Sequence, residues 1–137
     1  MRRYLLDTNI ASFVIKGNRP EITAKLASLS PSAVTISAVT KAEIVSGLAR
    51  FDYNAGLAEQ IRRFLVRVKA LPWDQDVAWV YGDLRAAWAR AGIVLGSLDM
   101  MIAAHAVAVD AVLVTRDKAL ARAPAPLVTD GWAAHQP

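Results

Sequence analysis

Four acidic residues occur where a metal-dependent reaction at a phosphate could use them. Asp7 follows the apolar run YLL, and the other three lie in the segments ISAVTKAEIVSG, GSLDMMIAAHA and LVTRDKAL, as Glu43, Asp99 and Asp117. Mg²⁺ and Mn²⁺ prefer carboxylate and water oxygens, and their open positions bind phosphate oxygens. Four carboxylates held close together would repel strongly without a cation. The sequence therefore predicts a Mg²⁺ (or Mn²⁺) site if the fold brings these acids together.

Short apolar segments alternate along the chain with longer segments of helical periodicity. Strands are expected at 3–6, 33–36, 70–72, 111–115 and 127–129, and helices at 21–29, 38–51, 57–68, about 74–92 and 98–109. This alternation predicts an α/β fold, with a central parallel sheet of about five short strands flanked by helices. A length of 137 residues predicts one domain, spanning residues 1–137.

The four acids fall at equivalent places in this predicted fold. Ligands of open parallel sheets bind outside the carboxyl ends of the strands. Asp7 closes the first strand, and Asp117 follows the fourth by two residues. Glu43 lies in the first two turns of the helix after the second strand, and Asp99 in the first turn of another helix. All four are therefore expected at one edge of the sheet.

Each acid also has a purely structural explanation. Asp7 could cap a following helix, and Asp117 could cap a short helix that runs through Leu120. The segment from Thr40 to Glu43 fits the capping-box pattern, and Asp99 could complement the positive end of its helix. These explanations are independent of one another, whereas the metal-site hypothesis explains the four positions together.

Composition narrows the remaining classes of function. The absence of cysteine excludes disulfides, thiolate metal sites and cysteine nucleophiles, and it fits a reducing cytoplasm. No glycine-rich phosphate loop, secretion signal or membrane span is apparent, so a soluble cytoplasmic protein is expected. His105 is predicted to be a packed or hydrogen-bonded histidine and His135 an exposed or disordered one. A formal charge of +4 mildly favours polyanionic partners.

Several segments, in order over nearly the whole chain, resemble the VapC-type toxins of the PIN-domain family. They are YLLDTNI, SAVTKAEIVSGLAR, LPWDQDVAWVYGDLRAAWARAG, LDMMIAAHAVA, LVTRDKAL and the late GW. The resemblance implies a PIN-like three-layer fold and a metal-dependent endoribonuclease that a VapB-like antitoxin from the same operon holds inactive. The acids of that family map onto Asp7, Glu43, Asp99 and Asp117. A homodimer and a toxin–antitoxin hetero-oligomer are expected.

Other side chains are expected to support this site. The resemblance places a hydroxyl beside the metal at Thr115 or Ser37, and a polar residue after the first acid at Thr8 or Asn9. Thr8 and Asn9 are also expected to turn the chain after the first strand. RNA contacts are predicted for basic residues near the sheet edge, which are Lys16, Arg19, Arg116, Lys118 and Arg122. Relatives often have Asn at the position of Arg116 and Gly at that of Asp110.

Three other functions fit the sequence less well. A phosphatase or dehalogenase-like hydrolase would use Asp7 as a nucleophile, but it usually has a second acid where Asn9 stands. A receiver-like signalling module would need an acidic pair after the first strand. A catalytically inactive PIN-like scaffold that binds RNA or protein would be expected to have lost some acids, yet all four are present.

Overall fold

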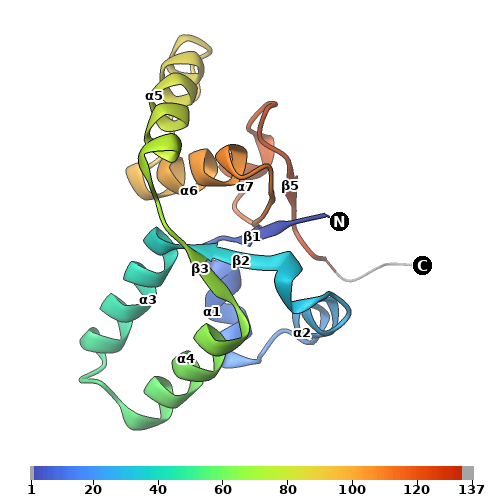
Figure 1. The fold of residues 1–137 in the computed structure, drawn as a ribbon, viewed down its shortest axis with the longest axis vertical. Coiled ribbons are helices and arrows are strands. Elements are labelled where there is room, and N and C mark those ends of the chain that lie inside the picture. Colours follow the sequence, from blue (N-terminus) through green and yellow to red (C-terminus); the bar gives the residue numbers. More distant parts are fainter. Residues whose placement is uncertain (1, 134–137) are drawn as a thin grey trace.

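The computed structural model describes residues 2–133 and contains a central five-stranded sheet (Figure 1). The strands are β1 (Tyr4–Leu6), β2 (Val34–Ser37), β3 (Lys69–Leu71), β4 (Val112–Val114) and β5 (Thr129–Asp130). Their order across the sheet is β3-β2-β1-β4-β5, and every neighbouring pair is parallel. The predicted α/β class and the parallel sheet of about five short strands are confirmed.

Seven α-helices within residues 2–133 connect and cover the strands. They are α1 (Thr8–Lys16), α2 (Pro20–Ala27), α3 (Ala38–Arg50), α4 (Ala55–Arg67), α5 (Gln75–Arg90), α6 (Ser97–Ala108) and α7 (Lys118–Arg122), with a 3₁₀ turn at Pro31–Ala33. The expected helices are all present, with their ends shifted by a few residues. His135 lies outside the described residues.

Helix α1 is the element that the periodicity did not predict. Thr8 and Asn9 do not form a separate turn after β1, because they are the first two residues of this helix. The carboxylate of Asp7 accepts a hydrogen bond from the backbone N–H of Ile10, so the helix begins directly after the strand. The short polar segment DTN therefore marks a helix start.

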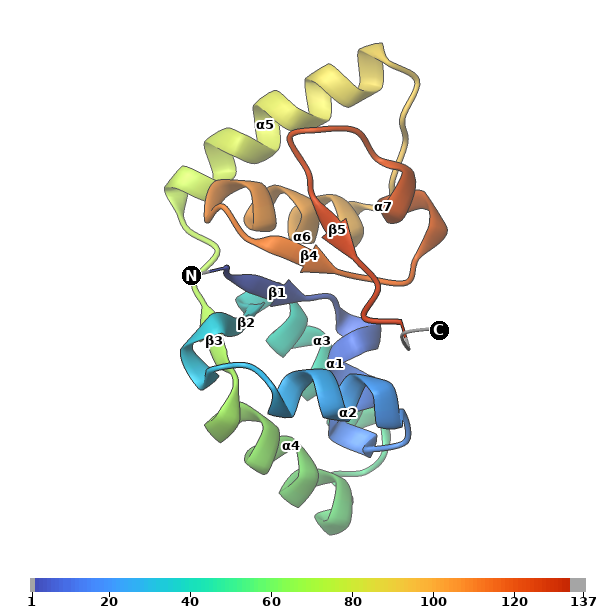
Figure 2. The ribbon, with the colours of Figure 1, turned by 90° about the vertical axis from the view of Figure 1, so that its right-hand side faces the viewer.

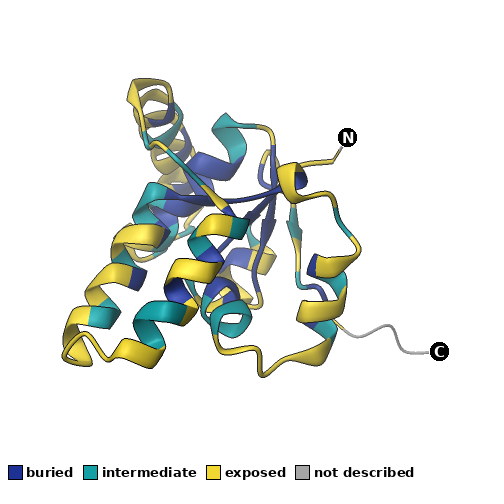
Figure 3. Cartoon of the chain, turned by 60° about the horizontal axis from the view of Figure 1, so that its bottom comes forward, coloured by how far each residue is buried: buried dark blue, intermediate teal, exposed yellow. Residues whose placement is uncertain are grey.

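Helices cover both faces of the sheet and make three layers. Helices α1 to α4 lie on one face and α5 to α7 on the other (Figures 1 and 2). Alternate residues of β1 point to opposite faces of the sheet. Tyr4 and Leu6 pack in the core on the α1–α4 side, and Leu5 packs in the core on the α5–α7 side. The three central strands, β1, β2 and β4, are accordingly buried between exposed outer helix faces (Figure 3).

The capping pattern of α3 corrects one explanation given above. Its N-cap is Ser37, as expected, and the Ser37 hydroxyl accepts a hydrogen bond from the Val39 N–H. Thr40 is therefore a fully buried residue inside the helix and not the start of a capping box.

None of the helices in residues 2–133 is long and apolar enough to cross a membrane.

Candidate active site

Three polar side chains stand in a row at the carboxyl edge of the three central strands. Leu6 of β1 pairs with Ile36 of β2 and with Val114 of β4. The next residues of these strands, Ser37, Asp7 and Thr115, are therefore neighbours across the sheet, and all three are buried. A parallel sheet thus delivers one carboxylate and two hydroxyls to the same edge.

Thr115 connects Asp7 to the segment that carries Asp117. Its hydroxyl donates to Oδ2 of Asp7 at 2.5 Å and accepts from the backbone N–H of Asp117 at 3.1 Å. The second oxygen of Asp7 accepts from the Ile10 N–H at 2.8 Å. Asp117 in turn caps α7 by accepting from the Leu120 N–H at 3.0 Å. Both acids are therefore N-caps as well as neighbours at this edge.

Glu43 reaches the site from the second turn of α3. Its Oε1 accepts a hydrogen bond of 2.6 Å from the hydroxyl of Thr8, which lies 3.4 Å from the Thr40 hydroxyl. This contact ties α3 to the start of α1, immediately after Asp7. The sequence left open whether Thr8 or Asn9 is the polar residue that supports the first acid. Thr8 contacts Glu43, whereas Asn9 is exposed.

Electrostatic repulsion links the acids in pairs, Asp7 with Asp99 and Asp117, and Asp99 with Asp117 and Glu43. Burial raises the pKa of Asp7, and the charges of Asp99 and Asp117 raise it further, against the lowering effect of the hydrogen bonds from Thr115 and Ile10. Burial likewise raises the pKa of Asp99, with added repulsion from Asp117 and Glu43. Such mutual repulsion is relieved when a cation binds among the carboxylates.

The four carboxylates are chemically suited to a hard divalent cation, although they do not yet form a complete coordination site. Among residues 2–133, no three acidic or histidine side chains already form a group that could hold a metal ion. The donors are all carboxylate oxygens from four segments, the ligand type that Mg²⁺ and Mn²⁺ prefer.

The basic residues expected to bind RNA have different surroundings. Lys16 lines a hollow of about 350 Å³ between α1, α3 and α4, in which Glu43 and Asn9 also lie. Lys118 and Arg122 are exposed on α7 after Asp117. Arg116 instead donates to the carbonyls of Gly131 and Trp132 and pairs with Glu21 at 3.1 Å, so contact with RNA would compete with these bonds. Arg19 lies over the ring of Phe13, 4.5 Å from its centroid.

His105 confirms the prediction of a packed, hydrogen-bonded histidine. It is fully buried on α6, and its Nδ1 lies 2.7 Å from the hydroxyl of Ser37. Of the two hydroxyls expected beside the metal, Thr115 therefore contacts an acid and Ser37 contacts His105. The sequence held no signal for the Ser37–His105 pair, because the two residues are 68 positions apart.

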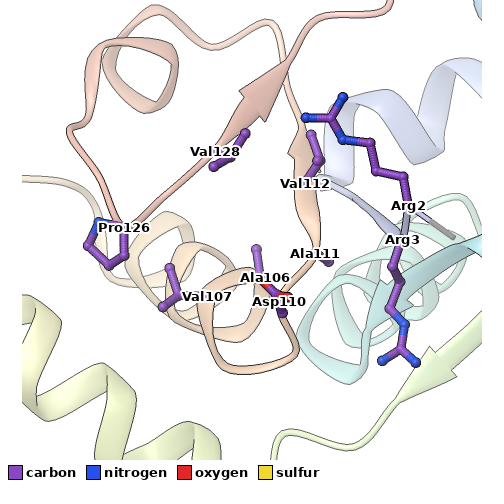
Figure 4. A pocket seen from close by; sticks show the side chains of 9 residues that line it. All are labelled: Arg2, Arg3, Ala106, Val107, Asp110, Ala111, Val112, Pro126 and Val128. Atoms are coloured by element: carbon purple, nitrogen blue, oxygen red, sulfur yellow. The ribbon is translucent and has the colours of Figure 1, made fainter.

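A second hollow of about 350 Å³ lies at the opposite edge of the sheet (Figure 4). The residues that precede β1, β4 and β5 line it, together with the end of α6; among them are Arg2, Arg3, Asp110, Ala111 and Val128. It is separated by the full length of the strands from Asp7 and Thr115. This hollow therefore has no part in the chemistry of the four acids.

Comparison with known proteins identifies the family. The PIN domain model matches residues 4–126. The tRNA(fMet)-specific endonuclease VapC of Shigella flexneri is 32% identical over 96% of this chain and 99% of its own length. The crystal structure of DNA-bound VapBC from Salmonella typhimurium superposes with a TM-score of 0.87 at 30% identity, over 97% of this chain and 100% of that one. The VapBC2 structure from Rickettsia felis superposes with a TM-score of 0.83 at 28% identity, over 93% of this chain and 96% of that one. The chain therefore belongs to the PIN-domain family, as a VapC-type ribonuclease toxin.

Proposed function

We propose that the protein hydrolyses RNA phosphodiester bonds with Mg²⁺ or Mn²⁺ held by Asp7, Glu43, Asp99 and Asp117. The observation that carries this proposal is the buried Asp7 carboxylate at the carboxyl edge of the sheet, joined through the Thr115 hydroxyl to the backbone N–H of Asp117. A divalent cation bound by such carboxylates activates a water molecule and polarises the scissile phosphate. No side-chain nucleophile is then required.

The protein's own residues would prepare the site for this reaction. Asp7 is fixed on both oxygens, by Thr115 and by the Ile10 N–H, so its carboxylate has one orientation. Thr8 holds Glu43 at the rim of the α1/α3/α4 hollow, where the Glu43 carboxylate can orient a water molecule. Lys16 and the α7 residues Lys118 and Arg122 would contact RNA phosphates on either side of the acids.

We further propose that a VapB-like antitoxin occupies the α1/α3/α4 hollow. The walls of this hollow are largely apolar and include Ile44, Leu48, Phe51, Leu57 and Ile61. Glu43 also lines it. Phe51 is 66% exposed, which an amphipathic helix of a partner would cover. Solved relatives include VapBC and FitAB toxin–antitoxin complexes, which supports such a partner. A cytoplasmic complex containing two copies of the toxin is the assembly we propose.

Cleavage of RNA by the purified chain tests the proposed reaction. Antitoxin-free protein is incubated with total cellular RNA and with a tRNA(fMet) transcript, in Mg²⁺ or Mn²⁺ and in EDTA. We expect cutting in both metals and none in EDTA. Asp7→Asn should remove at least about 99% of the activity, because it removes a carboxylate from the most connected position of the site.

The control variant is Asp83→Asn, which removes an exposed carboxylate from α5. It should cut RNA at the wild-type rate. If the wild type cuts no RNA although it is folded and loaded with metal, the inactive-scaffold alternative replaces this proposal. Equal cutting with EDTA would instead refute the metal requirement.

A further inference from the structure

The bond between Ser37 and His105 joins the two helices that carry Glu43 and Asp99. The distance between the Ser37 Oγ and the His105 Nδ1 is 2.7 Å, and both side chains are fully buried. Ser37 caps α3 and stands six residues before Glu43, while His105 lies on α6 six residues after Asp99. The bond therefore links the two elements, α3 and α6, that carry these acids.

The pair lies directly against the row of polar residues at the sheet edge. Side chains two residues apart on a strand point to the same face. Leu5 and Leu113 pack with the α5–α7 cluster, so Asp7 and Thr115, two residues further on, face the same side. Ser37 occupies the equivalent position of β2, and His105 meets it from α6. The imidazole is thus packed beneath the site but contacts none of the acids.

Stability alone does not account for a histidine at this position. The Nε2 of His105 is buried and has no hydrogen-bond partner within residues 2–133. A buried polar atom without a partner is unfavourable, so an apolar side chain of similar volume would serve the core better. Burial also lowers the pKa of His105, against the raising effect of the Asp74 charge. What the imidazole adds is a directional bond to Ser37.

Apolar packing between these helices is not directional. Val39, in the first turn of α3, packs against the cluster that contains Met100 and Ala103 of α6. Apolar contacts of this kind hold the helices together but tolerate sliding. A hydrogen bond of 2.7 Å loses most of its strength when its atoms shift, so it can set the position of α6 against α3.

We propose that Ser37 and His105 are positioning residues of the nuclease site, which fix the separation between Glu43 and Asp99 through their buried hydrogen bond. This inference rests on the function proposed above. The charge of Glu43 already acts on Asp99, so a displacement of α6 changes how well the two carboxylates can share a cation. Outer partners that orient metal ligands typically contribute 10–100-fold to affinity or activity.

Three variants of the full chain test the bond. His105→Leu removes the imidazole and keeps its volume, and Ser37→Ala removes the hydroxyl and leaves the imidazole, should the first variant not fold. His105→Asn places an amide near the position of Nδ1 and should restore the bond. The matched control is Ile102→Ala, a buried residue on the same helix that makes no polar link.

The readouts are the dissociation constant for Mn²⁺ alone, by calorimetry, and kcat and KM for RNA at saturating metal. We expect His105→Leu and Ser37→Ala to weaken Mn²⁺ binding about tenfold and to lower kcat by a similar factor, with KM within about twofold of wild type. His105→Asn should recover most of both losses. Ile102→Ala should lower the melting temperature and leave Mn²⁺ affinity unchanged.

Two results would overturn the positioning role alone. One is wild-type Mn²⁺ affinity and kcat in His105→Leu or Ser37→Ala. The other is an equal loss in Ile102→Ala without recovery in His105→Asn, since that pattern reports general destabilisation. If the wild type neither binds Mn²⁺ nor cuts RNA, the proposed function itself fails and the positioning role fails with it, so the two failures are distinct.

Discussion

Thr115 is the residue through which the acids at the end of β1 and after β4 are connected. Its hydroxyl donates to Asp7 and accepts from the Asp117 N–H. Since a hydroxyl has one proton and two lone pairs, it can do both at once. Without this hydroxyl, Asp7 would keep only the bond from Ile10, and its carboxylate would be free to rotate. The side chain is therefore expected to matter more for activity than for stability.

Thr115→Val, which nearly preserves the shape of the side chain, tests this expectation. We predict a decrease of about 10–100-fold in kcat for RNA cleavage, because the orientation of Asp7 is lost. The matched control is Thr35→Val, since Thr35 is also buried on a central strand but donates to the Tyr4 carbonyl. Both variants should lose about 1 kcal/mol of unfolding free energy, measured in urea. A similar decrease in kcat for Thr35→Val would show that fold stability alone explains the effect.

At this scale the sequence pointed to the four acids and, through the family resemblance, to Thr8, Ser37 and Thr115, but not to the contacts that these hydroxyls make. The positions of Asp7, Glu43, Asp99 and Asp117 follow from strand ends and helix starts, which local patterns reveal. The contacts between Thr8 and Glu43 and between Ser37 and His105 join residues 35 and 68 positions apart. Such pairs depend on how layers pack, so no local pattern predicts them. The capping-box explanation of Glu43 was wrong because Ser37, three residues before Thr40, caps α3.

At the scale of elements, most strands and helices followed from periodicity because their apolar positions face one or two cores. Helix α1 was not predicted because its first residues, Thr8 and Asn9, are polar and suggested a turn after the strand. β5 was expected two residues too early, since Leu127 and Val128 suggested a strand. Leu127 instead packs in the α5–α7 cluster, and pairing with β4 begins at Thr129.

Arg116 connects the segment that follows β5, Gly131 and Trp132, to the rest of the fold. Its guanidinium donates to the carbonyls of Gly131 and Trp132, and it pairs with Glu21 of α2. Trp132 is 3% exposed, and its ring meets Tyr4 edge-on, with 5.5 Å between centroids. The segment after β5 is therefore held by Arg116 together with the packing of Trp132 against Tyr4. Contact between Arg116 and RNA, which the sequence predicts, would compete with these bonds.

Replacing Arg116 should accordingly affect stability. We predict that Arg116→Ala loses about 1–2 kcal/mol of unfolding free energy, because two charge-assisted bonds to carbonyls disappear. Arg116→Lys should lose nearly as much, since a single ammonium cannot reach the partners of a planar fork. Glu21→Gln should have a smaller effect, because exposed ion pairs contribute little. Thermal and urea unfolding measure all three, and a larger loss in Glu21→Gln than in Arg116→Ala would contradict this assignment.

For the whole molecule, the distribution of charge has to reconcile an acidic site with a polyanionic substrate. The chain has 16 Lys and Arg against 12 Asp and Glu, a formal charge of +4, although four acids gather at one edge of the sheet. RNA must approach these acids, so cations beside them are required to offset the repulsion. Exposed Lys118 and Arg122 on α7, directly after Asp117, are among the cations that we propose for this role.

The salt dependence of RNA binding measures that contribution. In an Asp7→Asn background, which prevents cutting, the logarithm of the association constant should fall linearly with the logarithm of salt concentration. We predict that Lys118→Ala with Arg122→Ala makes this slope shallower by about 1–1.5, since each phosphate contact on a single strand contributes about 0.7.

The matched control for that double variant is Arg62→Ala with Arg63→Ala, which removes the same net charge from α4, where both arginines pair with Glu59. If the slope depends on cations beside the acids, this control should leave it nearly unchanged. An equal change in both double variants would mean that RNA responds only to the total charge of the protein. In that case Lys118 and Arg122 of α7 would not be part of a specific RNA-binding surface beside the acids.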